Sequence, residues 1–117
     1  MTLDINIRKR MAENKKYLSE GDLADGRDRI VQIKDVVEEI IENPKIGRKD
    51  KGIVLHFEGD IKPMVLGSKV NMTAMIKATG TDMTKDWVGK KIQLFRGIEA
   101  RSETGFAVRI RDFEPQG

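Results

Sequence analysis

Three short segments alternate apolar and polar residues, which is typical of β-strands that bury one face. They are residues 53–58, 91–96 and 105–111. The residues predicted to face the core are Ile53, Leu55 and Phe57 in the first segment, Ile92 and Leu94 in the second, and Phe106, Val108 and Ile110 in the third. These segments predict three strands that share one buried side.

A further strand and a helix are expected between the first and second of these strands. Residues 62–66 would pair back onto residues 53–58 through a Gly-containing turn. Residues 69–79 have helical spacing, with Ser68 or Asn71 as the N-terminal cap and Gly80 at the C-terminal end. The predicted apolar stripe of the helix is Met72, Met75, Ile76 and Thr79.

Residues 29–43 fit two patterns. Their apolar residues occur both at helical spacing and, with exceptions, at strand alternation. Seven of the fifteen residues are Val or Ile, whose stiff side chains suit a pleated surface. We interpret the segment as a long, bent strand with a bulge near residues 35–36. A helix in this position would exclude the fold described next.

The predicted order is three strands, one helix and two strands, so the fold class is mostly β with one helix. This is the connectivity of the five-stranded oligonucleotide/oligosaccharide-binding (OB) barrel. A chain of 117 residues suits one domain. We expect an OB-like barrel over residues 17–114, preceded by a basic arm, residues 1–16, that is flexible or helical.

The formal net charge of +3 is unevenly distributed along the chain. Residues 8–16 hold five basic residues against one acidic residue, residues 45–51 hold four against one, and residues 90–111 hold six against two. Residues 28–43 hold five acidic residues against two basic ones. Segregated positive charge can follow a phosphate backbone, although a solvated surface produces the same pattern.

An OB barrel presents its second and third strands, and the loops joining strands 1–2 and 4–5, to its ligand. Here these loops are residues 44–52 and 97–105, and both adjoin basic clusters. The predicted nucleic-acid-binding residues are Lys45, Arg48, Lys49, Lys51, His56, Phe95, Arg96, Arg101, Arg109 and Arg111.

Several of these side chains also have a purely structural interpretation. Phe95 is out of phase with the inward residues of its strand, so its ring could stack on a base or pack on the outer face. Arg96, Arg109 and Arg111 are placed on the face opposite the core. There they could contact phosphates or pair with nearby acidic residues. Trp87 is expected to pack in the core, because buried tryptophan usually does so with its N–H bonded.

The residue content argues against catalysis and metal binding. The chain has no cysteine and only one histidine, His56, so no metal site is expected. No nucleophile elbow or phosphate-binding loop occurs. We therefore expect a non-enzymatic protein without a cofactor. No secretory signal and no run of about 18 apolar residues occurs, so a cytoplasmic protein without a membrane partner is expected.

Four segments of the chain resemble a family of small bacteriophage and prophage proteins. They read YLSEGDL, KGIVLHFEGDIKPMVLGSKVN, GTDMTKDWVGKKIQLF and GFAVRIR. The resemblance spans roughly residues 17–111, and DWVGK at residues 86–90 is its most specific part. It implies an OB-fold protein that is similar to single-stranded-DNA-binding proteins, and it implies no catalytic motif.

Two functional hypotheses follow from these features. The first is binding of single-stranded DNA, or RNA, with little sequence preference in phage DNA metabolism. The second is a phage accessory protein that binds a host or defence protein, since one fold hosts many functions. Exposed strand edges would also permit a homodimer.

Overall fold

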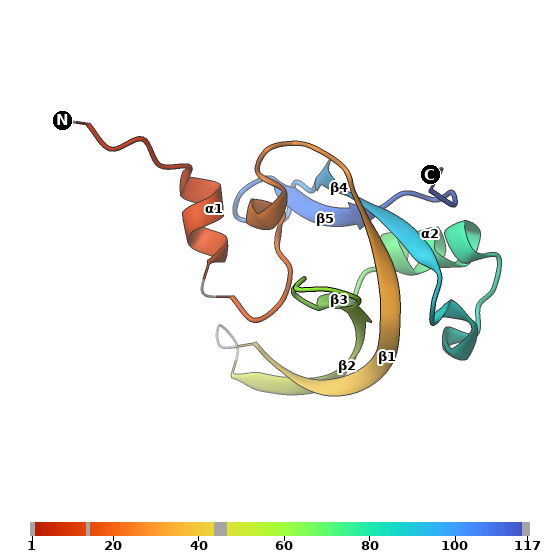
Figure 1. Ribbon diagram of the computed structural model, residues 1–117. Coiled ribbons are helices and arrows are strands. Elements are labelled where there is room, and N and C mark those ends of the chain that lie inside the picture. Colours follow the sequence, from red (N-terminus) through yellow and green to blue (C-terminus); the bar gives the residue numbers. More distant parts are fainter. Residues whose placement is uncertain (1, 14, 44–46, 116–117) are drawn as a thin grey trace.

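Five antiparallel strands form one sheet in the computed structural model of the protein, which describes residues 2–13, 15–43 and 47–115 (Figure 1). The strand order is β3-β2-β1-β4-β5. The elements are α1 (Ile7–Ala12), β1 (Arg29–Asn43), β2 (Arg48–Phe57), β3 (Met64–Leu66), α2 (Lys69–Thr79), β4 (Lys91–Ile98) and β5 (Phe106–Ile110), with 3₁₀ turns at Glu20–Leu23 and Thr84–Trp87. The prediction of a mostly β fold with a helix between the third and fourth strands is confirmed.

The long strand β1 belongs to both halves of the sheet and curves between them (Figure 1). Its residues 29–32 pair with β4, and its residues 33–43 pair with β2. The register with β2 shifts between Ile33 and Asp35, so Lys34 is an extra residue of the kind that makes a β-bulge and bends a strand. The interpretation of residues 29–43 as a bent strand is confirmed, with the bulge slightly nearer the N-terminus than predicted.

The sheet is not closed, because β3 and β5 are its two edges and do not pair with each other. The side chain of Asn71, at the start of α2, reaches the free edge of β5 instead. Its Nδ2 donates to the carbonyl oxygen of Val108 at 3.0 Å, and its Oδ1 accepts from the backbone N–H of Ile110 at 3.3 Å. A side-chain amide thus occupies part of the space that a neighbouring strand would fill.

The hydrophobic core lies inside the curve of the sheet and contains most of the residues predicted for it. The predicted residues that are buried are Leu55, Phe57, Ile92, Leu94, Val108 and Ile110. Ile53 is partly buried against the same cluster, and Phe106 is half-buried. Trp87 is also buried, and its Nε1 donates to the carbonyl oxygen of Thr81 at 2.9 Å. The prediction that Trp87 packs in the core is therefore confirmed.

Helix α2 begins and ends as predicted, and its buried stripe shares Met75 with the predicted one, while Met72 is partly buried against the core. Ser68 is the N-cap and accepts from the N–H of Asn71, and Gly80 follows the helix with a φ of 75°. The buried residues are Asn71, Ala74, Met75 and Ala78. Ile76, which was expected to face the core, is exposed. The prediction gave priority to large apolar residues, whereas the helix turns two alanines and a bonded amide towards the protein.

The N-terminal segment contains the helix α1, which is anchored to the body of the protein. The Lys62 ammonium donates to the carbonyl oxygen of Ala12 at 2.6 Å and to Asp22 at 3.0 Å. The backbone of α1 passes so close to Gly21 that a methyl group there would collide with the carbonyl oxygen of Arg8. The helical alternative for part of the arm is therefore confirmed.

Replacing Asn71 should strongly destabilise the protein. In Asn71→Leu the Val108 carbonyl and the Ile110 N–H would lose a buried partner, which should lower the free energy of unfolding by about 2–4 kcal/mol. Urea unfolding would measure this loss, with Thr73→Ala as a control on an exposed position of α2. A loss below about 0.5 kcal/mol, the usual range for surface changes, would contradict the role of Asn71.

A methyl group at residue 21 should displace α1 from the body of the protein. We expect Gly21→Ala to increase backbone hydrogen exchange across residues 7–12, because the helix must move away from the added Cβ. Gly67→Ala is a matched control, since the nearest atom to its added Cβ would be 3.8 Å away. Unchanged exchange in Gly21→Ala would mean that the contact is not tight in solution.

Candidate functional site

The structure does not bring the predicted binding residues together into one surface. Lys45 lies outside the described residues, and the backbone of Arg48 begins β2. Lys49 and Lys51 are exposed on the part of β2 that pairs only with β1. The Lys51 ammonium lies 4.0 Å from Glu38 of that strand. These lysines therefore place positive charge on the end of the β1–β2 hairpin, and neither of them lines the cavities described below.

His56 is occupied by contacts within the protein. Its Nε2 lies 2.6 Å from Oε2 of Glu39, whose other oxygen accepts from the Tyr17 hydroxyl at 3.2 Å. Lys16 adds an ion pair to Glu39 at 3.6 Å. The His56 bond, followed by the Tyr17 bond and the Lys16 charge, lowers the pKa of Glu39. This cluster fastens residues 16–17 to the β1–β2 hairpin.

Arg96 does not lie on the outer face with the other two predicted arginines. It pairs across the sheet with Val108, and residues opposite each other in a ladder share a face, so Arg96 lies on the core side. Its guanidinium lies 4.5 Å from the centre of the Phe106 ring and donates to the carbonyl oxygen of Ala24. The prediction was wrong on this point, although residues 92, 94 and 96 have the same parity and predict a common face.

Arg109 lies on the outer face and is largely neutralised by an acidic partner. Its Nη2 lies 2.6 Å from Oε2 of Glu99, and its Nη1 donates to the Ser68 hydroxyl at 3.3 Å. The N–H of Arg101 bonds the same carboxylate, and together these two groups lower the pKa of Glu99. The Arg101 residue itself is exposed. Arg109 therefore orders the loop before β5.

Phe95 and Arg111 form a stacked pair on the outer face. The guanidinium carbon of Arg111 lies 3.7 Å from the centre of the Phe95 ring. Asp28 fixes the guanidinium through Nε at 2.9 Å and Nη2 at 3.3 Å, and Gln93 donates to the same carboxylate at 2.7 Å. The Arg111 bond and then the Gln93 bond lower the pKa of Asp28. This four-residue arrangement holds a flat cation rigidly over an aromatic ring.

This pair lines a cavity of about 580 Å³ between α2, β5 and the C-terminal segment, which we call the α2 cleft. Its other lining residues include Lys69, Val70, Thr73, Lys77 and Phe113. Both lysines are exposed and form no ion pair with the part of the chain that is described. The α2 cleft therefore combines two aromatic rings, a fixed guanidinium and two mobile ammonium groups.

Sequence reasoning missed Lys69, Lys77 and Phe113. A signal for the lysines was present, because Lys69, Thr73 and Lys77 follow each other at intervals of four residues and so share one face of α2. Phe113 lies beyond β5, and no periodic pattern places it.

The described residues contain no group of three or more His, Cys, Asp or Glu side chains arranged to hold a metal ion. Within the same residues, no helix is long and apolar enough to cross a membrane. Comparison with protein-family models, with curated proteins and with solved structures finds no match for this chain.

The Asp28–Arg111 pair should make stability depend on pH. Because the folded pKa of Asp28 is lowered, the pair stabilises the protein above the ordinary pKa of 3.8, and this stabilisation is lost as the pH falls through the folded pKa. Asp28→Asn should therefore be less stable than the wild type at pH 6, and the difference should shrink below about pH 4.

Urea unfolding of both proteins between pH 6 and pH 3 would measure this difference. Arg111→Gln provides the control, because Asp28→Asn should change stability much less once its main partner is gone. The same difference at pH 6 and pH 3 would show that Arg111 does not control the Asp28 carboxyl.

Proposed function

We propose that this protein binds single-stranded nucleic acid through the α2 cleft. The observation that carries the proposal is the guanidinium of Arg111, stacked at 3.7 Å on Phe95 and held by Asp28 at the edge of a cavity with two exposed lysines. Proteins that bind single strands combine stacking surfaces with positive charge.

The chemistry of the α2 cleft suits an unpaired base and its phosphates. A base has a π-face that can stack on an aromatic ring or on a planar guanidinium, and such stacking tolerates any sequence. Asp28 already holds the Arg111 guanidinium in place, so binding of a base does not have to order this side chain. This reduces the entropic cost of binding. Lys69 and Lys77 would contact phosphates as flexible point charges. A cavity of about 580 Å³ is of the size that holds one small ligand.

We propose that the sheet is an OB barrel that is left open between β3 and β5. The support is its connectivity, with α2 between the third and fourth strands, and its shared bent strand β1. OB barrels are described as partly open. Together with the resemblance to phage proteins, this leads us to propose a role in phage DNA metabolism. Lys49, Lys51 and Arg101 would supply further contacts to the strand outside the α2 cleft.

Fluorescence anisotropy with a labelled oligonucleotide of about 20 bases would test this proposal, since single-strand sites cover roughly 4–16 nucleotides. We expect saturable binding that prefers single strands to duplex and weakens linearly with the logarithm of salt concentration. Phe95→Leu should weaken binding about 5- to 100-fold, because one stacked base contributes about 1–3 kcal/mol.

Phe106→Leu is the matched control, because Phe106 lies on the other side of the sheet, between the guanidinium groups of Arg8 and Arg96. It should leave the affinity within about twofold. Equal losses in both variants would place the strand elsewhere. An absence of binding at low salt by a folded protein would refute the function and favour an accessory protein that binds a host or defence protein.

A further inference from the structure

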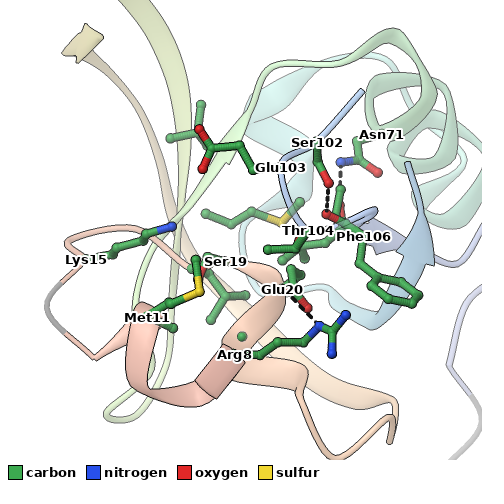
Figure 2. A pocket seen from close by; sticks show the side chains of 17 residues that line it. Arg8, Met11, Lys15, Ser19, Glu20, Asn71, Ser102, Glu103, Thr104 and Phe106 are labelled. Carbon is green, nitrogen blue, oxygen red and sulfur yellow. Dashed lines mark hydrogen bonds and ion pairs between the residues drawn. The ribbon is translucent and has the colours of Figure 1, made fainter. Parts of the chain in front are cut away.

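A second cavity of about 480 Å³ lies where the sheet fails to close, and we call it the edge gap (Figure 2). Met64 and Val65 of β3 line one side, and Phe106 and Val108 of β5 line the other. Residues 18–21 and Asn71 also line the gap, and Asn71 bonds the β5 edge at Val108 and Ile110, so the gap leaves room for side chains between the two strand edges. A cavity of roughly 150 Å³ can already hold a benzene molecule, so several side chains fit into the edge gap.

Helix α1 forms a wall of the edge gap and does not fill it. Arg8, Met11 and Ala12 line the cavity. Nε of Arg8 lies 3.5 Å from the largely buried carboxylate of Glu20, and its guanidinium lies 5.0 Å from the Phe106 ring. These contacts fix α1 beside the gap (Figure 2). The residues that precede α1 are thereby brought close to the gap without entering it.

Those residues have the pattern of a strand that lacks a sheet. Residues 2–6 belong to neither a helix nor a strand, and Leu3, Ile5 and Ile7 alternate with polar residues along the sequence. The exposed fractions are 81% for Leu3, 39% for Ile5 and 66% for Ile7. Alternation of this kind is typical of a strand with one buried face, yet Leu3 and Ile7 are mostly exposed in the described chain. We call residues 2–6 the N-terminal strand segment.

The N-cap of α1 directs this segment away from the edge gap of its own chain. Asn6 has extended backbone angles, and its side-chain oxygen accepts from the N–H of Lys9 at 3.0 Å. The chain before Asn6 runs outwards from the molecule (Figure 1). Folding back into the neighbouring gap would require a reversal at Asn6 and the loss of this cap. The N-terminal strand segment of a second molecule can enter the gap while its own cap at Asn6 stays intact.

We propose that two copies of this protein exchange their N-terminal strand segments, each lying in the edge gap of the other. The exchange is reciprocal and closes with two-fold symmetry, so it yields a dimer and no longer chain of molecules. Leu3 and Ile5 would bury their side chains in the gap between β3 and β5. Asp4 of the exchanged segment would pair with Lys15, which lines the gap; neither residue has an ion-pair partner in the described chain.

Sedimentation equilibrium of the full chain over a range of concentrations would test the exchange. The wild type should be a dimer that dissociates on dilution. Leu3→Asp and Ile5→Asp should each raise its dissociation constant about 10-fold or more, because each removes the apolar side chain that the exchange would bury. Ile40→Asp is the control, since the exposure of Ile40, 66%, lies between those of Leu3 and Ile5 but Ile40 is on β1, and this variant should remain dimeric. A monomeric wild type, or equal weakening by all three changes, would overturn the proposal.

Disulfide trapping would separate exchange from other modes of association, and the absence of cysteine gives a clean background. A mixture of Ile5→Cys and Val65→Cys proteins should form a mixed disulfide dimer on mild oxidation, whereas a mixture of Ile40→Cys and Val65→Cys should not. If the double variant Ile5→Cys/Val65→Cys forms only an intramolecular disulfide, the segment occupies its own gap and the exchange is refuted. Failure of the mixed disulfide to form would also refute it.

The exchange goes beyond the proposed nucleic-acid binding and can fail independently of it. The edge gap and the α2 cleft have no residue in common. Leu3→Asp should therefore keep its intrinsic affinity for the oligonucleotide while losing the dimer, and Phe95→Leu should keep the dimer while losing affinity.

Discussion

One extra residue in β1 determines the shape of this protein. Lys34 interrupts the ladder between β1 and β2, and the strand changes its partner from β4 to β2 at that point. If β1 were flat, its partners β2 and β4 would lie in one plane with it and could not enclose a core. Because β1 bends, Val31 and Ile33 face the same core as Leu55 and Leu94. The two cavities and α2 take their positions from this curve.

The bend brings β3 and β5 near each other without pairing them. The side chain of Asn71 bonds part of the β5 edge instead. A buried amide is costly unless its groups are bonded, and here the amide nitrogen and the amide oxygen both bond the free edge of β5. Helix α2 therefore borders β5 in two places. Its N-terminal turn reaches the open edge, while its lysines border the cleft where Arg111 lies on Phe95.

The sequence predicted the elements well, because each depends on a local pattern. Alternation located β4, β5 and the C-terminal half of β2, and the content of Val and Ile decided correctly between strand and helix for β1. Residues 48–52 were expected in a loop, but they form the first half of β2. The candidate site was harder to predict, because ion pairs depend on which segments meet. Asp28 and Arg111 are 83 residues apart, and no local pattern connects them. The barrel closure was assumed from connectivity, whereas closure requires an edge-to-edge pairing that no local pattern predicts.

The errors on individual residues have different causes. For Arg96, strand alternation alone predicts the core side, and the basic character of the residue was given too much weight. For Ile76, a large apolar side chain was preferred to Ala74, although small residues are the ones that allow a helix to approach a sheet closely. His56 and Arg109 are engaged by Glu39 and Glu99. Pairing of Arg109 with a nearby acidic residue, which the sequence left open, agrees with its contact to Glu99.

The far end of the β1–β2 hairpin has a property that the rest of the sheet lacks. Residues 48–52 of β2 and their partners in β1 have no third strand beside them, because β3 pairs with residues 53–55 and β4 with residues 29–32. A two-stranded ribbon is marginally stable on its own. The His56–Glu39–Tyr17 cluster lies near the base of this ribbon and marks the point where support by other parts of the chain begins. The ribbon can therefore open and reclose as a separate cooperative unit while the core stays folded.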